Sequence, residues 1–193
     1  MILLRYNDFS TGGELILKFY DYPIISKESS LPVFLVSVGL NEWQYQVKCD
    51  KGDNYAKALY CTKGSGVLIM NGEKHIIKPY TAFFIPASCL HEYYSTDESW
   101  DTHWIKPSGK SCPDMLKALG FDKPKIFPLP KEEITYLDHC FRCMHEALLS
   151  DKVDGNFRAS GYLYSFFIEL SRLAAKGKGS VQIAPAVTKA IAY

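Results

Sequence analysis

The feature that most constrains the fold is a run of short apolar strands between residues 31 and 106. The dipeptide Asn71-Gly72 separates two of them, and a type I′ hairpin turn, which needs positive φ at both central residues, favours this pair. Many short strands with turn residues between them are typical of β-sandwiches and β-barrels. The predicted strands are 31–38, 42–48, 58–62, 66–70, 74–78, 82–86, 90–95 and 100–106.

Helical patterns follow the predicted strands. A short helix is expected at 111–119, between a possible cap at Ser111 and a stop at Gly120. Two longer helices are expected at 131–149 and 156–175, where apolar residues recur three and four positions apart. The turn between them is short, so they should form an antiparallel hairpin. We therefore expect an α+β, mainly β fold: a double-stranded β-barrel or jelly roll followed by a C-terminal antiparallel helical hairpin.

The predicted helix at 156–175 carries more apolar surface than one contact can bury. Two of its faces are apolar, and they consist of Tyr162, Leu163, Phe166, Leu170, Leu173 and Ala174 on one side and of Phe157, Tyr164, Ile168 and Ala175 on the other. We expect the first face to pack on its own domain and the second to form a homodimer interface. A helix wholly buried within a monomer is the alternative.

Composition and charge indicate one globular domain without a nucleic-acid surface of its own. The 193 residues are 47% hydrophobic, which is enough for one sizeable core. Lys and Arg number 22 against 21 Asp and Glu, so the chain lacks the basic surface that DNA binding requires. The first apolar run is interrupted at Arg5 and is too short for a signal peptide or a membrane span. We expect a cytoplasmic protein with no membrane contact.

The six cysteines are scattered through the chain, and we expect reduced thiols. The segment 139–145, HCFRCMH, gathers His139, Cys140 and Cys143 within two helical turns. No second Cys/His pair completes a four-ligand metal site, and Cys140 falls on the apolar stripe of its helix. Ordinary helix packing is therefore the favoured interpretation of this segment.

The last residues resemble a linker followed by the beginning of another helix. The segment 176–180, KGKGS, has the composition of a flexible linker. After Pro185, apolar residues recur at helical spacing up to the end of the chain. From this pattern we expect a further domain downstream.

An ordered set of short motifs lies within residues 60–109. It consists of Gly64-Ser65-Gly66, the Asn71-Gly72 turn, the strand end at 83–86 (FFIP), His91-Glu92-Tyr93, and the pair Trp100 and Trp104. In order and spacing this set resembles the cupin-type sensor domain of the AraC family of transcription regulators. The helical hairpin and the linker extend the resemblance loosely to nearly the whole chain. Two positions depart from the family pattern: Tyr80 replaces a usual Gly, and Lys106-Pro107 replaces the usual aromatic residue after the second Trp.

The resemblance implies that Tyr93, Thr102 and Trp104 line a pocket, because matching positions lie in the sugar pocket of a family member. Period-two alternation places Trp100 on the same strand face as Thr102 and Trp104, and His91 on the same face as Tyr93. A Trp face suits a sugar or another small molecule, and hydroxyl groups can orient it. The candidate ligand-binding residues are therefore His91, Tyr93, Trp100, Thr102 and Trp104. Plain core packing is the alternative for the two Trp residues.

A metal-dependent enzyme is the main competing hypothesis, because enzymes with cupin barrels hold a metal through several His and Glu side chains. His91 stands about where one such ligand would be, but the strand at 58–62 has no His or carboxylate and His75 is isolated. A catalytic metal needs about three protein ligands. We expect no metal, no cofactor and no catalytic residue. A free-standing cupin enzyme with a metal in the barrel stays open, as does a carbohydrate-binding module without regulation.

These observations predict three segments: a cupin-like ligand-binding barrel with an N-terminal arm at 1–110, a helical dimerisation region of the same domain at 111–176, and a linker with the start of a truncated DNA-binding domain at 177–193. On this hypothesis the chain is the ligand-sensing and dimerisation domain of an AraC-family regulator and not an enzyme. Its partners would be a small-molecule effector, a second copy of itself, and DNA only through a missing C-terminal helix-turn-helix domain.

Overall fold

Strands make up most of the computed structural model, which describes residues 18–97, 99–151 and 154–176. The segment at 177–193 and most of the predicted N-terminal arm lie outside these ranges. The strands are β1 (Lys18–Asp21), β2 (Phe34–Asn41), β3 (Val47–Cys49), β4 (Lys57–Cys61), β5 (Gly66–Met70), β6 (Glu73–Ile77), β7 (Thr81–Ile85), β8 (His91–Ser95), β9 (Thr102–Ser108) and β10 (Lys125–Pro128).

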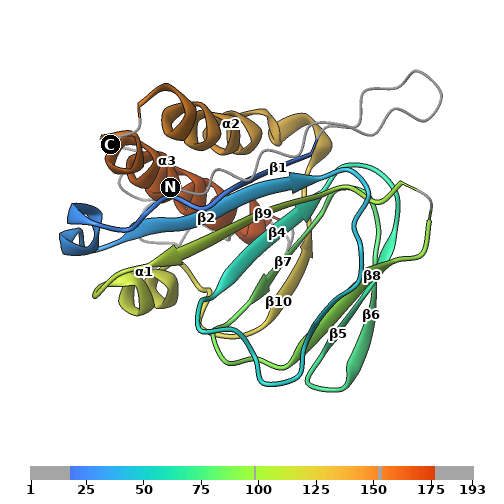
Figure 1. The fold of residues 1–193 in the computed structure, drawn as a ribbon. Helices are drawn as coiled ribbons and strands as arrows, with labels where there is room; N and C mark the ends of the chain where they lie inside the picture. Colours follow the sequence, from blue (N-terminus) through green and yellow to red (C-terminus); the bar gives the residue numbers. More distant parts are fainter. Residues whose placement is uncertain (1–17, 98, 152–153, 177–193) are drawn as a thin grey trace, which may run out of the picture.

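Two antiparallel sheets face each other and form the barrel. The larger sheet has the order β1-β2-β9-β4-β7-β10, and the smaller sheet has the order β3-β8-β5-β6. The helices are α1 (Cys112–Ala118), α2 (Thr135–Ser150) and α3 (Gly155–Lys176). Figure 1 shows α2 and α3 over one face of the larger sheet, with the smaller sheet on its other side and α1 beside one end. No helix within the described ranges is long and apolar enough to cross a membrane.

Successive residues of the central strands enter two different cores. On β4, Leu59 belongs to the core between the sheets, whereas Tyr60 belongs to the core beneath the helices. On β9, Trp104 and Ile105 divide in the same way. This period of two follows from the pleat of a strand. The larger sheet is therefore buried on both faces, and its inward residues define the barrel interior.

The helical hairpin packs on the outer face of this sheet. The buried residues of α3 include Leu163, Phe166 and Leu170, which belong to the same core as Leu35 of β2. Where helix and strand meet, the Leu35 backbone N–H donates to Ser160 Oγ at 3.1 Å. The hairpin thus closes one side of the barrel sheet and leaves the opposite face of α3 uncovered.

Most of the predicted elements are confirmed. The strands expected between 58 and 95 lie within one residue of β4 to β8, and the three helices and the hairpin occur where the sequence placed them. Asn71 and Gly72 have φ values of 49° and 86°, as the predicted turn requires. The α+β, mainly β barrel with a C-terminal helical hairpin is the observed fold.

Strands β2 and β9 begin and end two or three residues later than predicted, and three other strands differ more. The strand expected at 42–48 is wrong for most of its length, because only β3 forms, and Trp43 and Tyr45 are exposed. Here the chain leaves the sheet, and the Gln44 backbone N–H donates to the Trp100 carbonyl at 2.9 Å. The edge strands β1 and β10 were not predicted, since their strand character comes from pairing with β2 and β7.

Two glycines make room for the two large indole rings of the interior. A Cβ atom on Gly39 would overlap the ring of Trp104, its cross-strand neighbour, and one on Gly66 would overlap the ring of Trp100. Real side chains do not tolerate such contacts, so each ring lies directly on a glycine backbone. Gly39 therefore fixes how deep Trp104 lies in the barrel.

We expect Gly39→Ala to lower the free energy of unfolding by about 1–3 kcal/mol, because the added methyl group forces Trp104 or the strand to shift. Urea denaturation measures the loss. In a Trp104→Leu background the same Ala should cost much less, since the overlapping ring is gone. An equal loss in both backgrounds would contradict this account of the contact.

Candidate functional site

A small cavity of about 120 Å³ lies between the two sheets, on the side of β3. Residues from both sheets and from the loop before β3 line it: Tyr22, Asn41, Gln44, Tyr45, Val47, Lys57, Tyr93, Trp104 and Lys106. Inward positions of β4 and β9 supply the two lysines and Trp104. The cavity therefore combines aromatic walls with amide, hydroxyl and ammonium groups, a mixture typical of sites for small polar ligands.

Trp104 forms the main aromatic wall of the cavity. The rings of Tyr20 and Tyr22 lie near it, with centroid separations of 6.1 and 5.8 Å. Tyr93 forms part of the opposite wall, and burial holds the pKa of its hydroxyl far above the usual value. The phenol is therefore neutral and can donate a hydrogen bond. Among the described residues this hydroxyl has no hydrogen-bond partner, although Tyr93 is only 5% exposed.

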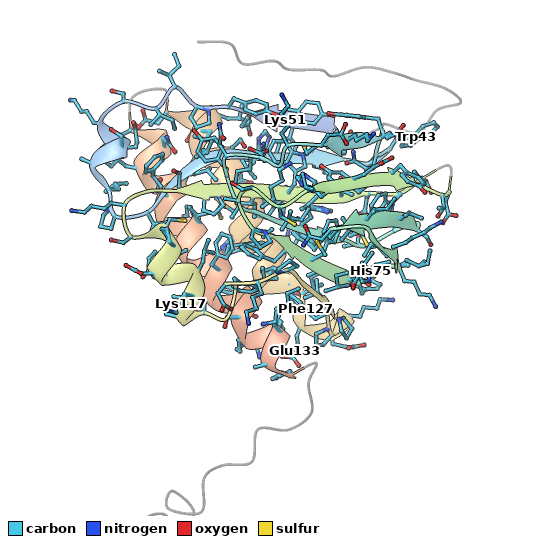
Figure 2. The ribbon with its side chains drawn as sticks, turned by 90° about the horizontal axis from the view of Figure 1, so that it is seen from below. Trp43, Lys51, His75, Lys117, Phe127 and Glu133 are labelled. Atoms are coloured by element: carbon cyan, nitrogen blue, oxygen red, sulfur yellow. The ribbon has the colours of Figure 1, made fainter. Side chains whose placement is uncertain are left out.

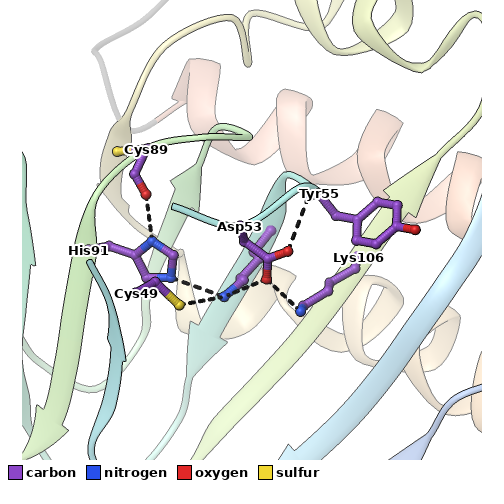
Figure 3. Close-up of polar contacts among 7 residues, drawn as sticks. Cys49, Asp53, Tyr55, Cys89, His91 and Lys106 are labelled. Carbon is purple, nitrogen blue, oxygen red and sulfur yellow. Dashed lines mark hydrogen bonds and ion pairs between the residues drawn. The ribbon is translucent and has the colours of Figure 1, made fainter. Parts of the chain in front are cut away.

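Asp53 joins the two lysines of the cavity (Figure 3). Its Oδ2 lies 3.1 Å from Lys57 Nζ and 2.7 Å from Lys106 Nζ, and its Oδ1 accepts the Tyr55 backbone N–H at 3.2 Å. Burial raises the pKa of the Asp53 carboxyl, but the hydrogen bonds from Lys106 and Lys57 outweigh it and bring the pKa to about 2. Two ammonium groups thus share one carboxylate, and the cluster carries net positive charge.

His91 completes this cluster as a neutral acceptor. Its Nδ1 lies 2.8 Å from the Cys89 carbonyl and its Nε2 lies 3.0 Å from Lys57 Nζ. The carbonyl can only accept and the ammonium can only donate, so this network assigns the proton to Nδ1. Burial lowers the pKa of His91, and the charge of Lys57 lowers it further against the opposing effect of the Cys89 hydrogen bond. The imidazole therefore holds Lys57 in place.

A second polar network fixes the amide side of the cavity. The Gln44 carboxamide oxygen accepts hydrogen bonds from Asn41 Nδ2 at 3.3 Å and from the Thr102 hydroxyl. Gln44 Nε2 donates to the Tyr45 carbonyl at 2.6 Å, and the Tyr20 hydroxyl donates to Asn41 Oδ1 at 2.9 Å. These bonds occupy the Thr102 hydroxyl and stiffen the wall next to Trp104.

The structure brings together only part of the predicted ligand set. Tyr93 and Trp104 line the cavity, as the family resemblance implied. Trp100 is fully buried in the core between the sheets, and neither it nor Thr102 lines the cavity. His91 lies behind Lys57 and does not line it either. As ligand contacts, all five residues stay predictions.

Sequence reasoning missed the charged residues of the site. Lys57 lies two and four positions before Leu59 and Cys61, so it shares their inward strand face. Lys106 lies two positions after Trp104 and shares its face in the same way. A lysine in register with an inward apolar series is a signal that could have found both. Asp53 lies on a loop outside any strand, so no pattern pointed to it.

Lys57 Nζ occupies a position surrounded by groups that often bind metals. Besides Asp53 and His91, Cys49 Sγ lies 4.0 Å from this ammonium. The ammonium group of Lys57 therefore provides, at this position, the positive charge that a metal ion would otherwise provide. Within the described ranges, no three His, Cys, Asp or Glu side chains are arranged to hold a metal ion.

In the segment 139–145, Cys140 is buried, and Cys143 Sγ lies 3.5 Å from His139 Nε2 at the surface.

A larger hollow of about 410 Å³ lies between α1 and the larger sheet. Figure 2 shows Lys117 of α1 on the side of the molecule away from Trp43 and His75. The hollow is lined mostly by apolar groups, among them Phe84, Leu116 and Phe121, and Lys117 and Asp122 are its charged residues. It has the greater volume, but the convergent charged and hydroxyl groups belong to the barrel cavity, which is therefore the candidate site.

The predicted dimer residues lie on the uncovered side of α3. Tyr164 and Ile168 are 47% and 51% exposed, Ala175 is exposed and Phe157 is half-buried. Tyr136 of α2 adds a further exposed ring, at 53%. Helix α3 is therefore not wholly enclosed in its own chain, and the alternative of complete burial within a monomer is wrong for these residues.

Asp53→Asn should destabilise the protein by about 1–3 kcal/mol at neutral pH, because two partly buried ammonium groups lose their shared carboxylate. Asp53 has a lowered pKa, so its contribution is present above about pH 4 and is lost as pH falls through about 2. The difference between variant and parent in urea denaturation should shrink over that range. Asp50→Asn, in the exposed Lys48 pair, should change stability by less than about 0.5 kcal/mol at any pH.

A family model described as AraC-like ligand binding domain matches residues 53–167, more than half of the chain. No significant match was found among curated protein sequences.

Three solved structures show a weak similarity to the chain. A putative ethanolamine utilization protein Q from Salmonella typhimurium LT2 is 16% identical, with a TM-score of 0.34 over 49% of this chain and 71% of that one. A cupin superfamily protein from Desulfitobacterium hafniense DCB-2 is 13% identical, with a TM-score of 0.35 over 47% and 76%. A salicylate 1,2-dioxygenase from Pseudaminobacter salicylatoxidans is 17% identical, with a TM-score of 0.33 over 48% and 25%. We draw nothing about function from scores this low.

Proposed function

The chain belongs to the family of AraC-like ligand binding domains, and from this premise we propose that it is the effector-sensing and dimerising part of a DNA-binding transcription regulator. The effector would bind in the barrel cavity, and DNA would be contacted by a further domain of the regulator. The near-neutral net charge of the chain supports the assignment of DNA binding to another domain, because a protein surface that binds DNA needs an excess of basic groups.

The observation that carries the proposal is the cavity between the sheets. Trp104 and Lys106 line it from β9 of the larger sheet, and Tyr93 lines it from β8 of the smaller sheet. A few polar groups fixed around an aromatic wall recognise small ligands by orientation as well as by contact area. Rigid strands also mean that little order has to be gained when the ligand binds.

The uncovered face of α3 supports the dimerisation part of the proposal. Phe157, Tyr164, Ile168 and Ala175 are separated by seven, four and seven residues, so they form one stripe along the helix. An exposed apolar stripe of this kind is costly in water and favours a second copy as its cover. Two such helices side by side would hold two attached domains at a fixed spacing.

Strand β9 connects the cavity to the helical hairpin. Trp104 faces the cavity, and its neighbour His103 stacks on Tyr60 and contacts Phe141 of α2, with centroid separations of 4.3 and 4.9 Å. A ligand that binds better to one arrangement of β9 and the helices would shift the population toward it. Coupling free energies of this type are about 1–3 kcal/mol.

The ligand-sensing role is tested by a thermal-shift screen of small polar metabolites, followed by titration calorimetry of those that raise the melting temperature. We expect Trp104→Leu to abolish the response, because the aromatic wall is lost. Trp43→Leu should leave it intact, since Trp43 is 53% exposed and lies outside the cavity. A response that survives Trp104→Leu would place the ligand elsewhere and refute the proposal.

The dimer is tested at Ile168. Ile168→Glu places a charge in the apolar stripe, so we expect a dimer in the parent and a monomer, or at least a tenfold weaker dimer, in the variant, as measured by sedimentation equilibrium. Ile76→Glu on β6 is the control, because Ile76 is equally apolar, 58% exposed and far from α3 in the fold. A parent chain that is monomeric at high concentration would contradict the dimer proposal.

A further inference from the structure

The charge of the cavity distinguishes between classes of effector. Two ammonium groups, Lys57 and Lys106, line it, and the single carboxylate of Asp53 lies between them. His91 is neutral and accepts a hydrogen bond from Lys57, so it changes the charge of the cluster in neither direction. The cavity therefore keeps one uncompensated positive charge among these groups. In a partly enclosed site such a charge attracts an anion more strongly than in water.

The two lysines differ in how many of their N–H donors are free to contact a ligand. Lys57 is almost fully buried, and its ammonium is surrounded by Asp53, His91 and Cys49. Lys106 Nζ has one partner among the described residues, Asp53, and its side chain is 21% exposed. An ammonium group has three N–H donors. Lys106 thus offers two donors to a ligand, whereas Lys57 is committed to the protein.

The neighbouring groups match a ligand that also carries hydroxyls. The Tyr93 hydroxyl has no hydrogen-bond partner among the described residues, and the indole of Trp104, which also lines the cavity, suits a short C–H chain or ring. Thr102, the hydroxyl that a neutral sugar would be expected to use, already donates to Gln44. With about 120 Å³, the cavity is well below the roughly 300–1,000 Å³ of pockets that take larger ligands.

We propose that the effector is a small hydroxylated carboxylate, such as a hydroxy acid or a sugar acid, whose carboxylate pairs with Lys106. Its hydroxyl groups meet Tyr93 and its carbon skeleton lies on Trp104. The inference rests on the proposed ligand-sensing function, and it specifies the charge of the ligand, which that function leaves open.

Three pairs of compounds that differ in the acid group test the proposal: glycerate with glycerol, gluconate with glucitol, and glucuronate with glucose. Thermal shift and titration calorimetry are applied to the parent, Lys106→Gln, Lys106→Arg, Lys74→Gln and Trp104→Leu. We expect an acid to bind at least tenfold more tightly than its neutral counterpart. Lys106→Gln should weaken that acid about 10- to 100-fold, the usual effect of losing a charge-assisted hydrogen bond.

The remaining variants separate charge from folding. Lys106→Arg keeps the charge and should retain most of the preference for the acid. Lys74→Gln removes an exposed charge on β6 and should have no effect. The melting temperature without ligand shows whether Lys106→Gln is folded. If it is not folded, the preference of the Lys106→Arg variant for the acid tests the role of the charge instead.

The outcomes also separate this inference from the proposed function. If the neutral compounds bind as tightly as the acids, and only Trp104→Leu abolishes binding, the barrel is a receptor and the carboxylate proposal is wrong. If acids bind but Trp104→Leu leaves their affinity unchanged, the barrel site is wrong as well. If neither series stabilises the parent, the carboxylate proposal fails, and the wider metabolite screen decides the ligand-sensing proposal separately.

Discussion

The structure depends on one sheet that is buried on both of its faces. Leu59 and Tyr60 are adjacent on β4, yet one packs between the two sheets and the other beneath the helices. Burial of apolar surface contributes roughly 25 cal/mol per Å², so burial on both faces stabilises the central strands of this sheet. The cavity takes its aromatic wall from the inner face of this sheet, and the helical hairpin rests on its outer face. Any shift of these strands therefore affects both.

The charged groups of the cavity depend on the same sheet for their positions. Lys57 begins β4 and Lys106 lies within β9, and both point inward because they keep the strand period. Two cations held close together repel each other, and Asp53 offsets this repulsion by accepting from both. His91 holds Lys57 without adding charge. The result is a site with one positive charge in excess among these groups, and the proposed carboxylate effector would offset that charge.

Between the cavity and the helices lies a polar layer that a simple apolar core would lack. Tyr60 donates to Asp138 of α2 at 3.1 Å and stacks on His103, and Asp101 accepts the backbone N–H groups of Thr62 and Lys63. Burial lowers the pKa of His103 despite the nearby carboxylates, so its ring packs as a neutral aromatic group. Directional contacts of this kind fix one arrangement of sheet and helix more strictly than apolar packing does. His103, the neighbour of Trp104 on β9, contacts Phe141 of α2.

The sequence by itself determined the local features: the turn at Asn71-Gly72, the alternation of β9 and the two-faced α3, because turn geometry, the strand period and the helix period are properties of neighbouring residues. The family resemblance, and not a local pattern, implied that Tyr93 and Trp104 line the cavity. Only the tertiary structure decided that residues 42–46 leave the sheet, that β1 and β10 join its edges, and that Asp53 reaches Lys57 and Lys106. These are long-range pairings, and their free energy depends on groups distant in the chain, so no local pattern records them.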